Sequence, residues 1–199
     1  MTYPPIILAS SSPRRFAVLT QIGVPFSVQV SNFNEREPAT YMTAKAVEKL
    51  VRENAFGKAS VVEKKVSNGL IIGVDTLIYG NGYPMGKPKD TADAIRMLSN
   101  LNNTKHTVFS GICLLLKNGG SIKKKIACDI STVWFRKLTK EEITRYAETG
   151  EPLDKAGAYG IQEKGAMLVR KVEGDYFSVV GFPLVLFMEL TKQLHIKVL

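Results

Sequence analysis

The chain has 199 residues, of which 45% are hydrophobic and 23% are charged, a composition typical of a globular protein with one substantial core. Its 27 Lys and Arg outnumber its 18 Asp and Glu, so the net charge of +9 favours an acidic partner, either a nucleotide or a nucleic acid. The two cysteines and two histidines are scattered along the chain, which argues against a disulfide framework and against a zinc site.

Neither end of the chain has the pattern of a targeting or membrane segment. Residues 1–5 lack the basic leader of a signal peptide, and the apolar run at 179–190 is short and interrupted by glycine, proline and glutamate. We therefore expect a soluble, cytoplasmic protein without a membrane partner. Because no linker rich in Pro, Gly or Ser divides the chain, residues 1–199 are expected to form a single domain.

Strand and helix patterns alternate through the first half of the chain. Apolar periodicity and helix breakers predict, in order, a strand at 6–9, a helix at 13–22, a strand at 26–30, a polar loop to about residue 40 and a helix through about residue 55. The near-continuous apolar run at 70–79 is typical of a buried strand, and Asn81-Gly82 behind it indicates a tight hairpin.

The second half adds a long hairpin and further helices. Asp90 is placed to cap a helix, and Thr139 with Glu142 forms a capping box for a helix that ends before Gly150. The other elements predicted are strands at 106–117 and 122–136 joined by an Asn-Gly-Gly turn, a strand at 166–172, and a last helix from Pro183 to about Leu194. Together these elements predict an α/β (mixed α+β) fold around a mixed sheet.

The most informative local pattern is an apolar strand that runs into three hydroxyls, a proline and two arginines. In Ser10-Ser11-Ser12-Pro13-Arg14-Arg15 the proline suits the first turn of a helix, whose free N–H groups and dipole attract anions. The two guanidinium groups add charge-assisted donors that match phosphate oxygens. The segment therefore predicts a polyphosphate-binding site, and a serine-capped surface helix with two solvated arginines is the alternative.

Asp75 stands inside the apolar run at 70–79, where an ionised carboxylate is unfavourable unless it is paired or bound to a metal. An acid on a strand at the edge of a cleft can bind a divalent cation or take a proton from water. Thr76 beside it supplies a second polar group. A hydrogen-bonded carboxylate that secures a turn is the structural alternative.

Two further segments carry groups suited to a metal–phosphate unit. Gly86-Lys87-Pro88 holds a lysine between a permissive and a rigid residue, which favours a point-charge contact with phosphate. Glu35 lies in the polar loop, and Lys45 and Lys49 follow four residues apart on one face of the next helix. Exposed loop and helix lysines explain the same residues equally well.

Residues 151–162 form a second segment with the composition of a binding site. Its small residues allow the backbone to approach a ligand, while Lys155 and Gln162 supply a cation and an amide that can contact a base edge. By chemistry alone, a glycine-rich connection with surface polar residues is the simpler interpretation.

Taken together, these segments resemble the Maf family of nucleoside triphosphate pyrophosphatases, also called septum formation inhibitor Maf proteins. The resemblance runs through the chain in order and rests on residues 8–15, 73–76, 86–88, 106–111, 154–162, 174–176 and 179–184. It implies an elongated, two-lobed, ITPase-like fold with the active-site cleft between the lobes. It also implies hydrolysis of a nucleoside triphosphate to the monophosphate and pyrophosphate with a divalent cation, Mg²⁺ or Mn²⁺.

The resemblance also implies a role for each candidate residue. Asp75 is the general base for the attacking water, and Glu35 and Asp75 are the metal ligands. Arg14, Thr76 and Gln162 match positions that tune substrate choice. The residues implied in phosphate binding are Ser10, Arg15, Lys87, Lys155 and Lys49.

The family carries a lysine followed by alanine in the helix after the Glu35 loop. Lys49 fits the spacing of that motif, whereas Lys45 has the alanine after it, so both lysines stay open as the phosphate ligand.

Residues 155–162 resemble the branch of the family that acts on dTTP and UTP, so we expect pyrimidine triphosphates, including modified ones, as substrates. The cellular role implied is house-cleaning of nucleotides or arrest of division. One alternative is the same chemistry on 7-methyl-GTP or another non-standard nucleotide. The other is a non-catalytic regulator that binds nucleotides or nucleic acid, although no clustered basic and aromatic pattern supports a nucleic-acid partner. Members often form homodimers, which is one expected assembly.

Overall fold

The computed structural model describes residues 4–198, and a mixed sheet of seven strands runs through this part of the chain. Six strands lie in the order β2-β1-β3-β5-β6-β7, and β4 pairs with β3. β1 is parallel to β2 and β3, and the other pairs are antiparallel. The strands are β1 (Ile6–Leu8), β2 (Ser27–Val28), β3 (Gly69–Gly80), β4 (Tyr83–Met85), β5 (Lys105–Asn118), β6 (Ser121–Phe135) and β7 (Val169–Glu173). The predicted α/β fold with a mixed sheet is confirmed.

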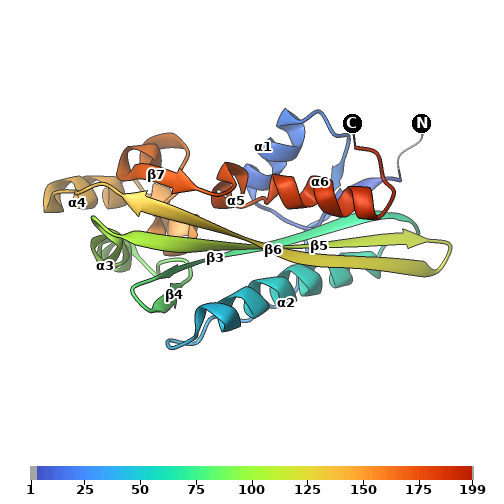
Figure 1. Cartoon of the computed structure of the whole chain (residues 1–199), viewed down its shortest axis with the longest axis horizontal. Coiled ribbons are helices and arrows are strands. Elements are labelled where there is room, and N and C mark those ends of the chain that lie inside the picture. The colour runs from blue at the N-terminus through green and yellow to red at the C-terminus, as the bar shows by residue number, and fades with distance from the viewer. Residues whose placement is uncertain (1–3, 199) are drawn as a thin grey trace.

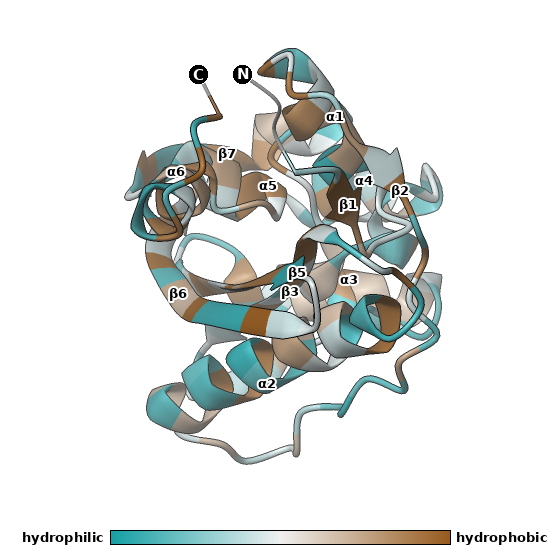
Figure 2. Cartoon of the chain, turned by 90° about the vertical axis from the view of Figure 1, so that its right-hand side faces the viewer, coloured by the Kyte–Doolittle hydropathy of each residue, from teal (hydrophilic) through white to brown (hydrophobic). Residues whose placement is uncertain are grey.

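Helices cover both faces of the sheet (Figure 1). The α-helices are α1 (Pro13–Gln21), α2 (Ala44–Glu63), α3 (Thr91–Leu101), α4 (Lys140–Glu148), α5 (Tyr176–Val180) and α6 (Leu184–Gln193), and the 3₁₀ helices are η1 (Glu151–Asp154), η2 (Ala156–Ala158) and η3 (Glu163–Leu168). Figure 2 shows α2 on one side of the sheet and α5 and α6 on the other. In the described part of the chain, every helix is too short or too polar to cross a bilayer.

Side-chain caps begin the helices where local sequence predicted them. Asp90 accepts a hydrogen bond from the backbone N–H of Asp93 at 2.7 Å and so caps α3. At α4, Thr139 accepts from the Glu142 N–H at 3.2 Å, while the Glu142 carboxylate accepts from the Thr139 N–H at 2.7 Å. This reciprocal pair is the predicted capping box, and it leaves no orphan donor at either position.

Three predicted boundaries were wrong. The helix expected to end near residue 55 continues to Glu63, because its apolar face extends through Ala59 and Val62. The strand expected at 166–172 begins only at Val169, since residues 163–168 form the 3₁₀ helix η3. The strand expected at 26–30 is only the two-residue strand β2. The short helix α5 was not predicted.

The long strands β3, β5 and β6 connect two apolar cores, which gives the molecule its elongated shape in Figure 1. One core gathers α1, α5 and α6, with Leu19, Phe182 and Phe187 at its centre. The other gathers α3, α4 and η3, with Leu98 and Phe135 buried between them. The expected elongated, two-lobed arrangement is therefore present.

The free edge of β3 lies between these two cores. β5 pairs with β3 along one edge, so β1 and β4 share the other edge. On that edge β1 pairs with residues 70–72 and β4 with residues 78–80. Residues 73–77 are left without a strand partner there, and Asp75 and Thr76 lie in this gap.

Two glycines bring α2 against the sheet beside the gap. A Cβ atom at Gly73 would lie 2.1 Å from the Ala55 carbonyl oxygen, and one at Gly111 would lie 2.5 Å from the Val51 carbonyl oxygen. Only hydrogen at these positions allows the helix to approach so closely. The close approach brings the polar side chains of α2 within reach of β3.

A buried histidine makes the stability of the second core depend on pH. His106 is 2% exposed, its Nε2 lies 2.7 Å from the Tyr159 hydroxyl, and its ring packs edge-on against Phe135. Burial lowers the pKa of His106 to about 4 from the ordinary value of 6.5. The unfolded chain therefore binds a proton below pH 6.5 that the folded chain binds only near pH 4.

We expect the free energy of unfolding to fall by roughly 2 kcal/mol between pH 7 and pH 5 because of this one group. Urea denaturation at both pH values measures the loss, and His106→Asn should remove most of it. His195→Asn, at an exposed histidine, is the matched control and should leave the loss in place. An equal pH dependence in wild type and His106→Asn would contradict the assignment.

Candidate active site

A cleft of about 610 Å³ opens beside residues 73–77 of β3, on the edge where neither β1 nor β4 pairs with them. Segments from all parts of the chain line it, including the start of α1, the loop at 30–38, part of α2 and the region 154–162. The predicted site residues that line it are Ser10, Arg14, Arg15, Glu35, Asp75, Thr76, Lys87, Lys155 and Gln162. One predicted residue, Lys49, lies elsewhere.

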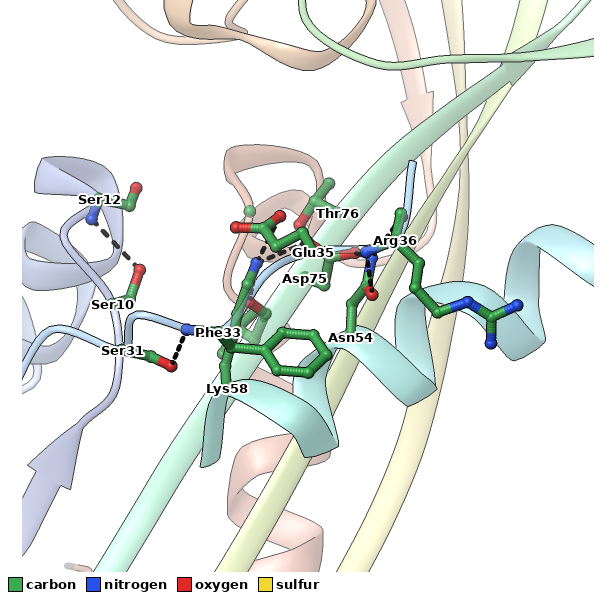
Figure 3. Close-up of polar contacts among 12 residues, drawn as sticks. Ser10, Ser12, Ser31, Phe33, Glu35, Arg36, Asn54, Lys58, Asp75 and Thr76 are labelled. Carbon is green, nitrogen blue, oxygen red and sulfur yellow. Dashed lines mark hydrogen bonds and ion pairs between the residues drawn. The ribbon is translucent and has the colours of Figure 1, made fainter. Parts of the chain in front are cut away.

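A lysine lies between two carboxylates that line the cleft (Figure 3). The Lys58 ammonium lies 2.7 Å from Asp75 Oδ1 and 3.0 Å from Glu35 Oε2, and it also donates to the Val74 carbonyl at 3.3 Å. The Lys58 and Asp75 side chains are only 9% and 8% exposed, whereas the Glu35 side chain is 51% exposed. Asp75 thus has the partner that a buried carboxylate requires, and Glu35 keeps an open side toward the cleft.

Asn54 joins the carboxylate on β3 to the loop that carries Glu35. Its amide nitrogen donates to Asp75 Oδ2 and to the Arg36 carbonyl, each at 3.0 Å. Its amide oxygen accepts from the Arg36 backbone N–H, also at 3.0 Å. With Lys58 on Oδ1 and Asn54 on Oδ2, both oxygens of Asp75 are held in place, and the loop is fixed beside them.

Arg15 and Ser10 form the cationic wall at the start of α1. The Arg15 Nε donates to the Gly181 carbonyl and its Nη1 to Ser10 Oγ, both at 2.9 Å. Burial lowers the pKa of Arg15, and the carboxylates of Asp75 and Glu35 oppose that shift. A guanidinium stays charged under such conditions, so it faces the cleft as a fixed cation beside the free N–H groups of the helix.

Asp154 holds two cations beside each other at the cleft. It accepts from Arg14 at 2.9 Å and from the Lys155 ammonium at 2.8 Å. Partial burial raises the pKa of Asp154, but the hydrogen bonds from Lys155 and Arg14 outweigh this effect and hold the pKa below its ordinary value. Arg14 and Lys155, which lie far apart in the sequence, are therefore kept together on one side of the cleft.

Comparison with known proteins decides the family. The family model described as "Maf-like protein" matches residues 5–194. The chain belongs to the Maf family.

Three similar proteins carry the same name. A protein of Dictyoglomus turgidum is 45% identical over 90% of this chain and 91% of its own length. One of Moorella thermoacetica is 43% identical over 93% and 92%, and one of Acetivibrio thermocellus is 43% identical over 98% and 97%. All three are named dTTP/UTP pyrophosphatase.

The lysine expected in the Maf cleft is not where the sequence placed it. Lys49 lies on the outer face of α2 with a side chain 76% exposed, 3.7 Å from Glu53, and lines a separate small hollow. Lys45 is also exposed. The apolar stripe of α2 turns both lysines away from the sheet, so the assignment of Lys49 to the cleft is corrected in favour of Lys58.

A signal for Lys58 was present in the sequence. Asn54 and Lys58 lie four residues apart on the apolar stripe of α2, where unpaired polar groups are unfavourable. Lys58 is also followed by an alanine, the pair expected from the Maf resemblance. Because the helix was predicted to end near residue 55, Lys58 lay outside the predicted helix.

Two serines behind Thr76 were also missed. Ser110 of β5 lies opposite Thr76 in the sheet, with the two hydroxyl oxygens 3.1 Å apart. Ser110 in turn donates to the Ser178 carbonyl at 2.7 Å. Ser110 belongs to the Maf-like segment 106–111, but only the register between β3 and β5 shows that it contacts Thr76.

Proposed function

We propose that this Maf protein hydrolyses dTTP and UTP to the nucleoside monophosphate and pyrophosphate. The observation that carries the proposal is a buried carboxylate, Asp75, held on both oxygens in a gap of the sheet and faced by a cationic wall. The names of relatives that cover nearly the whole chain support this substrate and this reaction.

The triphosphate binds along the cationic wall. The start of α1 offers backbone N–H groups, and Arg15, with Ser10 beside it, adds charge-assisted donors. Lys87, Lys155 and Arg14 also line the cleft. Together these groups hold the triphosphate in line for attack at the α-phosphorus, so much of the catalysis comes from positioning and from fixed positive charge.

Asp75 acts as the general base. It takes a proton from a water molecule, the water oxygen forms a bond to the α-phosphorus, and the bond to the α,β-bridging oxygen breaks to release pyrophosphate. Lys58 and Asn54 hold the carboxylate in the orientation that the proton transfer needs. They are positioning residues in this mechanism.

A divalent cation, Mg²⁺ or Mn²⁺, fits the donors available. Glu35 and Asp75 present two carboxylates to one end of the cleft, and hard cations of this kind bind one or two carboxylates together with substrate phosphates. Within residues 4–198 there is no cluster of three or more His, Cys, Asp or Glu, so phosphate oxygens and water would complete the shell. When bound, such an ion would neutralise charge on the phosphates and polarise the P–O bonds.

A substrate panel tests the proposal. Pyrophosphate release is measured for dTTP, UTP, CTP, 7-methyl-GTP and ITP with Mg²⁺ or Mn²⁺, and selective turnover of dTTP and UTP is expected. Turnover of 7-methyl-GTP or ITP instead would support the proposed reaction but contradict the proposed substrates. If no nucleotide of the panel released pyrophosphate, and nucleic-acid binding weakened steeply with salt, the non-catalytic regulator would be favoured.

A further inference from the structure

Three polar groups form a chain on the face of the sheet opposite the Asp75 carboxylate. Side chains alternate along β3, so Asp75 faces Lys58 on α2 while Thr76 faces Ser110 and α5. Thr76 lines the cleft, whereas Ser110 and Ser178 are fully buried. The chain of hydrogen bonds therefore runs from the core to the Thr76 hydroxyl, the one group of the three that lines the cleft and can contact a ligand.

The buried end of this hydrogen-bond chain determines the direction of its hydrogen bonds. The Ser178 carbonyl can only accept, so the single proton of the Ser110 hydroxyl is committed to it at 2.7 Å. Ser110 can then only accept from Thr76, whose own proton must lie along the 3.1 Å contact between the two oxygens. Thr76 Oγ1 thus presents lone pairs to the cleft and has no proton to donate there.

The surroundings of Thr76 suit an uncharged polar ring. Gly181 faces the hydroxyl, and a Cβ atom there would lie 3.7 Å from Thr76 Oγ1, so the absence of a side chain leaves that side of the hydroxyl open. Gly181 and the three residues of the hydrogen-bond chain carry no charge, and the Arg15 guanidinium nearby is hydrogen-bonded to the Gly181 carbonyl. A ligand group at this point must donate a hydrogen bond, because two acceptors that face each other repel.

We propose that Ser110 is a specificity-determining positioning residue, which orients Thr76 to accept from the imide N3–H of uracil or thymine and to reject cytosine. At the same ring position cytosine carries an unprotonated nitrogen, which is an acceptor. The inference rests on the proposed dTTP/UTP pyrophosphatase function and explains how this cleft distinguishes UTP from CTP. It assigns the discrimination to a residue that never contacts the substrate.

The test compares kcat/KM for UTP and CTP in wild type and in Ser110→Ala. Without Ser110 the Thr76 hydroxyl can rotate and donate to the cytosine nitrogen, so the ratio of UTP to CTP should fall by roughly tenfold. A role in folding alone would lower both values by the same factor and leave the ratio unchanged. A ratio within about twofold of wild type would therefore overturn the proposal.

Matched variants separate the hydrogen bond from its surroundings. Ser131→Ala removes another fully buried serine, which accepts from the Asp175 N–H at the start of α5 but lies outside the cleft, and the ratio should not change. Thr76→Val removes the acceptor with little change of shape and should lose the selectivity, whereas Thr76→Ser should keep it. Retained selectivity in Thr76→Val overturns the proposal even where Ser110→Ala fails to fold.

The same measurements distinguish failure of the inference from failure of the function. A wild-type protein that releases pyrophosphate from neither UTP nor dTTP would refute the proposed function itself. A wild-type protein that prefers UTP, with the same preference in Ser110→Ala, would refute only the role of Ser110.

Discussion

Asp75→Asn is expected to lower kcat by roughly a thousandfold, the range found for the loss of a general base, while nucleotide binding stays measurable. Asparagine has the same shape and its amide oxygen can still accept from Lys58, but its amide nitrogen faces the donating Asn54 amide, and it cannot take a proton from water. The cationic wall remains, so affinity for the triphosphate should change little. Pyrophosphate release gives kcat, and calorimetric titration with a non-hydrolysable dTTP analogue gives the affinity.

Asp90→Asn is the matched control for this variant. It makes the same chemical change at the cap of α3, outside the cleft, where asparagine caps as well as aspartate does. Its kcat should equal that of the wild type. If Asp75→Asn kept more than a tenth of the wild-type kcat, another group would have to be the base.

Lys58→Met is expected to be the most destabilising single change in the cleft. The substitution leaves the Asp75 carboxylate buried beside an apolar side chain, and loss of one partner from a buried ion pair typically costs about 3–5 kcal/mol. Activity should fall as well, because Asp75 loses the contact on Oδ1 that orients it. Urea denaturation measures the free energy of unfolding, and pyrophosphate release measures the activity.

Lys49→Met makes the same change on the same helix at the position that the sequence favoured. Its side chain is exposed and only weakly paired, so stability should stay within about 0.5 kcal/mol of wild type and activity should be unchanged. Equal effects of the two substitutions would show that the assignment of Lys58 to the cleft is wrong.

Much of the architecture could be predicted from local sequence, because the signals act over a few residues. The capping box at Thr139 and the cap at Asp90 lie where they were expected, since each depends on a contact three residues away. Asn81-Gly82 forms the turn between β3 and β4 with positive φ angles at both residues, as its composition predicted. The family, too, was identified from ordered motifs.

Predictions failed where the outcome depended on contacts between distant segments. The end of α2 was misplaced because no local stop signal marks it, and its last turns are stabilised by packing against β3 and β5. The strand expected at 166–172 begins only at Val169 because the residues before it belong to the 3₁₀ helix η3. Apolar alternation over a few residues does not distinguish such a segment from a strand.

The sequence by itself determined most of the helices and strands, the family to which the chain belongs and nine of the residues that line the cleft. Only the tertiary structure decided that Lys58 and Asn54 reach Asp75, that residues 73–77 form the gap in the sheet, and that Ser110 lies behind Thr76. The physical reason is the sequence separation between the residues that interact. Caps and turns depend on neighbours within about four residues, whereas these contacts join positions 17 to 34 residues apart and depend on strand register and on how closely α2 packs against the sheet.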